Sequence, residues 1–177
     1  MFSLRPDVIQ LYGILTVTAF DTKDGRLFRH TKKNQVTDLG REVVLGLLLQ
    51  DPAGDVYQQN PEYNQIWSLS VGDGTTPPSR DDTGLDNLLW TSVIARATDY
   101  TITYSPQWEI KISKVVPAGT LTGSNISEVG LFTRGDNDVP GLASNKRLYA
   151  RQVHAVVPKT PTMIIEYEWR LGVTVQI

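Results

Sequence analysis

The stretch that decides the fold is the final one, Met163-Ile-Ile-Glu-Tyr-Glu-Trp-Arg-Leu-Gly-Val-Thr-Val-Gln-Ile177. A large apolar residue occupies every odd position, whereas most positions between them are polar or charged. This period of two residues is the repeat of a β-strand, and no helix produces it. We expect a strand of this length to lie at the centre of its sheet or to pair across a subunit interface.

Earlier segments show the same alternation over shorter runs. They are residues 67–71, 100–104, 108–113 and 126–132, and residues 148–157 supply a further strand, with turn or loop residues between these segments. Ser105-Pro106 separates the second run from the third, which predicts an antiparallel pair with one face in water. Several short strands at this spacing indicate a two-sheet sandwich.

The first third of the chain predicts a hairpin followed by a helix. Residues 10–20 and 26–30 have strand composition and flank Asp24-Gly25, a dipeptide that favours tight hairpin turns. Thr37 is placed as an N-cap, and residues 37–50 carry apolar side chains at helical spacing. Gly40 and Gly46 each weaken a helix by about 1 kcal/mol relative to Ala, so we expect packing on a sheet to hold it.

These patterns predict a mainly β protein, an antiparallel two-sheet β-sandwich with one packed α-helix and an N-terminal β-hairpin. The 177 residues fit a single domain. Within it, residues 1–35 form an N-terminal arm and hairpin, residues 37–50 the helix and residues 66–177 the sandwich core.

Composition excludes several classes of function. The chain has no cysteine, which removes disulfides, thiolate metal sites and thiol nucleophiles. Its 17 Lys and Arg residues against 19 Asp and Glu residues form no basic stripe, so nucleic acid is not an expected partner. The run Val43–Leu49 is much shorter than the roughly 20 apolar residues of a membrane helix, and the first residues do not resemble a signal peptide.

No residue pattern predicts catalysis, a cofactor or a metal. His30 and His154 lie in predicted strands without the partners of a catalytic triad. The loop acids, which include Asp81, Asp82 and Asp86, lack the spacing of an EF-hand and are interpreted as solvated. Gly72-Asp73-Gly74 precedes two prolines and is interpreted as a turn, not as a phosphate-binding loop.

Glu128 is the most informative polar residue. Strict alternation places it on the same face as Ile126 and Phe132, so its carboxylate is expected to be partly buried. Burial without partners is costly, and we therefore expect Glu128 to accept hydrogen bonds from the backbone amides of a turn or to pair with an arginine. A catalytic acid is the alternative, but no partner residue for that role is visible.

The order of several short motifs resembles the N-terminal attachment module of phage tail-collar and tail-fibre proteins. These motifs are Val71-Gly72-Asp73-Gly74, the proline turn after it, Thr83 and Leu85, Trp90, Val116-Pro117, Ser127-Glu128-Val129-Gly130-Leu131-Phe132 and Val157-Pro158-Lys159. The resemblance covers residues 66–177. The segment from Asn34 to Gly40 also resembles the openings of small phage virion proteins. Tail fibres continue into a long shaft and this chain does not, so the resemblance implies an attachment module, not a complete fibre.

The resemblance implies a non-enzymatic structural protein of the virion, assembled in the bacterial host cytoplasm, that packs against other virion proteins as a homotrimer or another symmetric oligomer. A capsid decoration protein on the phage head is the alternative. A carbohydrate-binding module built on the tryptophans is a third possibility, but Trp67, Trp108 and Trp169 share faces with aliphatic residues, which indicates core positions. The interface candidates are the N-terminal arm and the 134–147 loop. They comprise Met1, Phe2, Leu4, Arg5, Arg134 and Arg147.

Overall fold

The computed structural model describes residues 8–23, 25–41, 65–95, 97–104, 108–134 and 147–176. Most of the predicted helix, the N-terminal arm and residues 135–146 of the interface loop lie outside these ranges. The predictions made for those parts therefore stay predictions.

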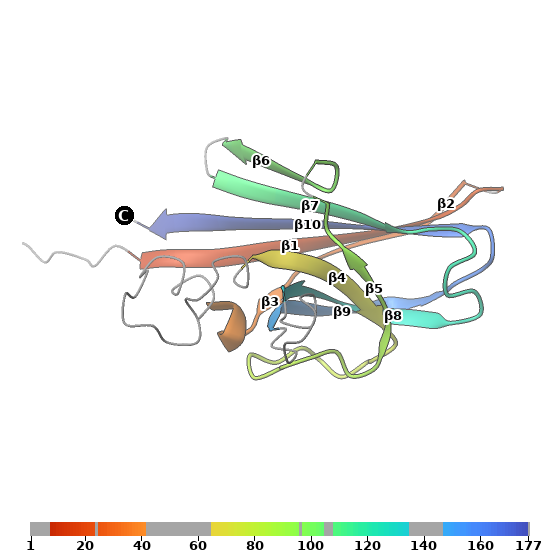
Figure 1. Ribbon diagram of the computed structural model, residues 1–177, viewed down its shortest axis with the longest axis horizontal. Helices are drawn as coiled ribbons and strands as arrows, with labels where there is room; N and C mark the ends of the chain where they lie inside the picture. The colour runs from red at the N-terminus through yellow and green to blue at the C-terminus, as the bar shows by residue number, and fades with distance from the viewer. Residues whose placement is uncertain are drawn as a thin grey trace, which may run out of the picture.

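Two five-stranded sheets face each other as two layers (Figure 1). The first sheet has the order β2-β1-β10-β7-β6 and the second has the order β3-β9-β8-β4-β5, with every pairing antiparallel. The strands are β1 Val8–Asp21, β2 Gly25–Lys33, β3 Gln35–Val36, β4 Ile66–Gly72, β5 Leu88–Val93, β6 Tyr100–Tyr104, β7 Trp108–Val116, β8 Asn125–Thr133, β9 Leu148–Pro158 and β10 Met163–Gln176. The predicted mainly β, two-sheet sandwich is confirmed.

The last strand lies at the centre of the first sheet, which is the first of the two positions expected for it. β10 pairs with β1 without a break from Val8 opposite Gln176 to Asp21 opposite Met163. Its other edge pairs with β7. The predicted N-terminal hairpin is also present, because β1 pairs with β2 and Gly25 adopts a φ of 84° at the turn.

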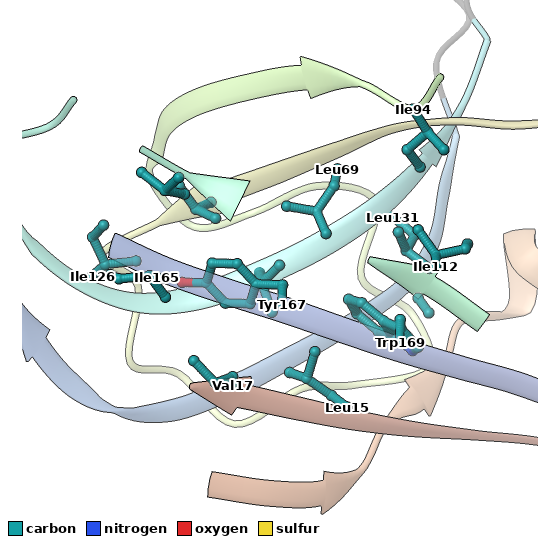
Figure 2. Packing of buried hydrophobic residues seen from close by; sticks show 14 of the residues in the cluster. Leu15, Val17, Leu69, Ile94, Ile112, Ile126, Leu131, Ile165, Tyr167 and Trp169 are labelled. Carbon is teal, nitrogen blue, oxygen red and sulfur yellow. The ribbon is translucent and has the colours of Figure 1, made fainter. Parts of the chain in front are cut away.

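The core lies between the sheets and follows the alternation of β10. Ile165, Tyr167 and Trp169 are fully buried, and the side chains between them point away from the core. Figure 2 shows these residues beside Leu15 and Val17 of β1, opposite apolar side chains of the second sheet. Each fully buried large side chain contributes about 1.5–3 kcal/mol relative to an exposed one.

Only the start of the predicted helix is described, at residues 38–41. Thr37 caps it as expected, because its Oγ1 accepts a hydrogen bond from the Gly40 backbone N–H at 3.0 Å. The Thr37 hydroxyl donates in turn to the Leu148 carbonyl of β9. A Cβ on Gly40 would lie 2.1 Å from the Tyr149 carbonyl oxygen, so Gly40 permits the close approach of this turn to the sheet. No helix within the described ranges is long and apolar enough to span a membrane.

The predicted antiparallel pair forms as β6 and β7, but its apolar face is only partly covered. Ile112 packs in the core, whereas Ile110 and Ile102 are exposed. The core thus includes the Ile112 end of this face, and the described isoleucines farther along it, Ile110 and Ile102, lie outside the core. Alternation predicted which side chains share a face, but it could not predict how far the opposite sheet extends.

A buried hydrogen-bonded pair joins the two sheets at His154 and Tyr167. The Nδ1 of His154 lies 2.8 Å from the Ala155 carbonyl, which can only accept, so Nδ1 carries the proton. The Tyr167 hydroxyl therefore donates to Nε2, at 3.3 Å. Burial lowers the pKa of His154 from 6.5 to about 4. The imidazole is consequently neutral at neutral pH.

This shift predicts an acid-sensitive stability. As the pH falls, His154 is protonated at a higher pH in the unfolded chain than in the folded chain. The contribution of neutral His154 to the free energy of unfolding is therefore complete above pH 6.5 and is lost as the pH falls toward 4. The shift corresponds to about 3 kcal/mol. Urea unfolding at about pH 7 and about pH 4.5 is expected to show a larger loss for the wild type than for His154→Gln. Equal losses in the two proteins would contradict this assignment.

Candidate functional site

The candidate site lies on the outer face of the second sheet, where the segment 73–87 covers β4, β8 and β9. Strict alternation predicted that Glu128 shares a face with Ile126, and this prediction is wrong. The pairing of β8 with β9 is irregular between these two residues, since Ile126 lies opposite Val157 and Glu128 lies opposite Val153, and strict alternation is broken there. Ile126, Val129 and Leu131 therefore pack in the core, and Glu128 faces outward beneath the segment.

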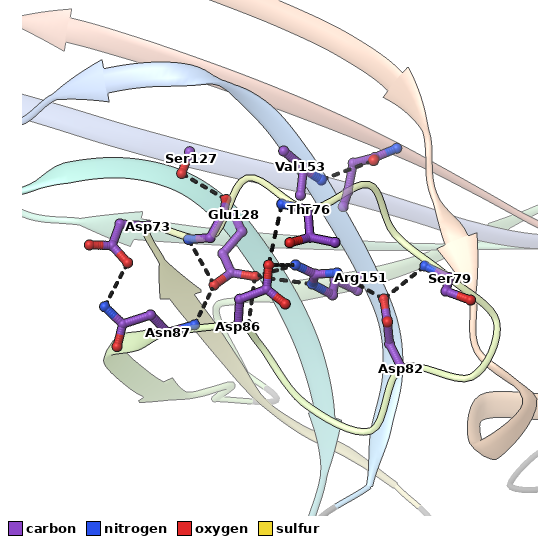
Figure 3. Close-up of polar contacts among 12 residues, drawn as sticks. Asp73, Thr76, Ser79, Asp82, Asp86, Asn87, Ser127, Glu128, Arg151 and Val153 are labelled. Atoms are coloured by element: carbon purple, nitrogen blue, oxygen red, sulfur yellow. Dashed lines mark hydrogen bonds and ion pairs between the residues drawn. The ribbon is translucent and has the colours of Figure 1, made fainter.

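Glu128 is fully buried, and four N–H groups surround its carboxylate (Figure 3). Oε1 accepts hydrogen bonds from the backbone amides of Gly74 and Asn87, both at 3.0 Å. Oε2 accepts from the Asp86 amide at 3.2 Å and from Nε of Arg151 at 3.0 Å. Both expected kinds of partner, turn amides and an arginine, are thus confirmed.

Arg151 of β9 connects this carboxylate to two more. Its Nη2 lies 2.9 Å from Oε2 of Glu128 and 2.8 Å from Oδ2 of Asp86, and its Nη1 lies 2.9 Å from Oδ2 of Asp82. We call Glu128, Arg151, Asp82 and Asp86 the Glu128–Arg151 cluster. The planar guanidinium presents its donors in fixed directions, which suits several carboxylates at once.

The charged groups of the cluster stabilise one another's charged forms. Burial alone would raise the pKa of the Asp86 carboxyl, but hydrogen bonds from Thr76 and the charge of Arg151 hold it below its ordinary value. Burial would likewise lower the pKa of Arg151, and the contacts with Asp82 and Glu128 raise it instead. Asp82 and Asp86 both form ion pairs with Arg151, which their interpretation as solvated loop acids did not include, and Asp86 remains exposed at the surface.

The motif glycines leave room for this arrangement. A Cβ on Gly72 would lie 2.2 Å from the Asn87 carbonyl oxygen and 2.5 Å from Oε1 of Glu128, and one on Gly74 would lie 2.5 Å from the same Oε1. A Cβ on Gly130 would meet the Leu148 and Leu85 side chains at 2.9 and 3.0 Å. Close approach of the segment to the sheet thus requires glycine at these positions.

Asp73 completes the set of motif residues. Its Oδ1 accepts a hydrogen bond of 2.7 Å from the Asn87 side-chain amide, and its backbone N–H donates to the Asn87 carbonyl. The structure therefore brings Gly72, Asp73, Gly74, Glu128 and Gly130 together in one place, although 53 residues separate Gly74 from Ser127, whose hydroxyl donates to the Gly74 carbonyl at 2.8 Å. Sequence reasoning missed Arg151, although an arginine inside a strand as apolar as β9 is a signal for a buried ion pair.

The segment 73–87 is also attached to the start of the helix. Nε and Nη2 of Arg80 lie 3.0 and 2.8 Å from Oδ1 of Asp38, and the Asp38 backbone N–H donates to the Arg80 carbonyl at 2.9 Å. The segment thus bridges β8, β9 and the helix start. This pair is exposed, so its contribution to stability is smaller than that of the buried cluster.

The two interface candidates that are described lie at the ends of β8 and β9. The Arg134 guanidinium lies 4.6 Å from the centroid of the Trp67 ring, and the Arg147 carbonyl accepts a hydrogen bond from the Thr133 N–H. Trp67 thus packs under an arginine, and Trp169 is buried in the core. A role for the 134–147 loop in an interface stays a prediction.

The geometry at Glu128 favours a structural role, in which the carboxylate holds a loop on the sheet, over a catalytic role. Each carboxylate oxygen already accepts two N–H groups, and the bonds hold a loop on a sheet. Among the described residues, no group of three or more His, Cys, Asp or Glu side chains is placed to hold a metal ion. Comparisons with protein-family models, with curated proteins and with solved structures found no match.

Replacing Glu128 is expected to destabilise the fold strongly. Glu128→Gln removes a buried charge that Arg151 needs and places an amide N–H₂ group among N–H donors. Breaking a buried ion pair in this way costs about 3–5 kcal/mol. Asp81→Asn, an exposed loop substitution, is the matched control and is expected to change stability by less than about 0.5 kcal/mol. Equal melting of Glu128→Gln and the wild type would refute the structural role of Glu128.

Proposed function

We propose that this chain is a non-enzymatic structural protein of a bacteriophage particle. In this role it is a baseplate or tail-fibre attachment module that packs against other virion proteins as a symmetric oligomer. The proposal rests on the resemblance of its motif order to tail-collar and tail-fibre modules, not on a matched relative.

One observation supports this proposal most directly. The two motifs that carry most of the resemblance, Gly72-Asp73-Gly74 and Glu128-Val129-Gly130, meet at the Glu128–Arg151 cluster. Motifs that recur in order only by chance have no reason to contact one another. Their contact is what a shared structural module requires, and it gives each motif residue a defined packing role.

The chemistry of the cluster also suits an attachment protein. Glu128, on which an enzymatic reading would have rested, is engaged by loop amides and by Arg151. A segment held rigidly on a sheet presents a fixed surface to a neighbour, because its conformation is set before binding and little entropy is lost on contact. The segment 73–87 is accordingly the part of this face that we assign to contacts within the particle.

The test is the copy number of the chain in particles. Phage particles are purified from lysates of the host that produces this chain, and its peptides are quantified against isotope-labelled standards. A small multiple of three or six copies per particle is expected for a tail component. Hundreds of copies would instead identify a capsid decoration protein, and absence of the chain from particles would refute a virion role.

A further inference from the structure

The four edge strands of the sandwich differ in how they are protected from pairing. An edge strand presents unpaired N–H and C=O groups, and proteins blunt it with charges or by keeping it short. β2 carries the exposed Arg29, Lys32 and Lys33, and β3 has only two residues. These two strands lie on the same side of the molecule, since β1 contacts β3.

The opposite side has neither form of protection. β5 and β6 end the two sheets there, and neither Leu88–Val93 nor Tyr100–Tyr104 contains a charged residue. Of the seven exposed large hydrophobic residues among those described, five lie on β5, on β6 or on β7 beside it. They are Leu88, Val93, Ile102, Ile110 and Val115. Exposed apolar side chains at an unprotected edge mark a surface for contact with another chain.

The sequence of β6 indicates which kind of chain pairs with this edge. Tyr100-Thr101-Ile102-Thr103-Tyr104 reads the same in both directions. When two such strands pair antiparallel about Ile102, Ile lies opposite Ile and Thr lies opposite Thr. Cross-strand pairs of threonine and of β-branched residues stabilise a sheet. A strand of this kind is complementary to itself, which is the requirement for a contact across a twofold axis.

We infer that β6 pairs antiparallel with β6 of a second copy of this chain, with the twofold axis at Ile102. The pairing joins two first sheets of five strands into one continuous sheet and covers Ile102, which is 57% exposed in the single chain. This contact is an interface through which the symmetric oligomer can form. Only its place in the particle rests on the proposed function. It implies a dimer, or a hexamer when combined with a threefold axis, and not an isolated trimer.

Single cysteines test the register, because the chain has none of its own. Residues directly opposite in an antiparallel pair have Cα atoms about 4.5–5.5 Å apart, within the range of a disulfide. Ile102→Cys is therefore expected to form a disulfide-linked dimer under mild oxidation. Thr101→Cys is the matched control, because two copies of residue 101 lie diagonally, about 7–8 Å apart, and do not cross-link efficiently.

A second pair of variants tests the contact in solution by light scattering. The wild type is expected to contain the dimer, at twice 19.7 kDa, or its hexamer. Ile102→Lys is expected to remove the twofold contact and to keep the wild-type far-UV circular dichroism spectrum, leaving the folded 19.7 kDa monomer or a trimer. Val156→Lys, at a position that is 52% exposed on β9, is expected to keep the wild-type mass.

Two results would overturn the inference: a wild-type monomer at all concentrations, or an oligomer that Ile102→Lys leaves intact and Ile102→Cys does not cross-link. Either result leaves the copy number in particles as a separate test, so the proposed function can survive the loss of this contact. A dimer cross-linked at residue 102 but absent from particles would support the contact and refute the proposed function.

Discussion

A carboxylate with no exposed surface is stable in a folded protein only when its charge is paired and its oxygens accept hydrogen bonds. Glu128 meets both conditions, through Arg151 and through three backbone amides of the segment 73–87. The position of that segment depends on this interaction. Removing one partner would leave the other charged and buried, so the segment and the sheet are held together as one unit.

The sandwich provides the frame for this cluster. β1 and β10 pair over their full 14 residues and place the longest apolar alternation at the centre of the first sheet. The second sheet packs on it through Leu69 and Leu131, and its outer face carries the small residues Ser70, Gly72 and Gly130. These small residues let the segment 73–87 approach the sheet closely at Gly72 and Gly130, and Ser70 is buried on the same face, where its hydroxyl lies 2.8 Å from that of Thr91 on β5.

Much of this was predictable from the sequence, because period-two alternation and turn residues are local signals. They predicted the long last strand, with a central position as one of two alternatives, together with the hairpin and the Thr37 cap. The cost of burying a charge predicted the kinds of partner that Glu128 has. The face of Glu128 was predicted wrongly, because the break in alternation depends on the irregular pairing of β8 with β9. Arg151 is distant in the sequence from Asp82 and Asp86, so its meeting with them follows from strand order. The exposure of Ile102 depends on how far the second sheet extends.

Amide hydrogen exchange measured by NMR tests most directly whether the Glu128–Arg151 cluster holds the segment. The amides of Gly74, Asp86 and Asn87, which donate to Glu128, are expected to exchange as slowly as those of β4 and β8, although they lie in a loop. The amide of Thr83, at an exposed position in the same segment, is expected to exchange fast and serves as the internal reference. Equally fast exchange of Gly74, Asp86, Asn87 and Thr83 would contradict the account.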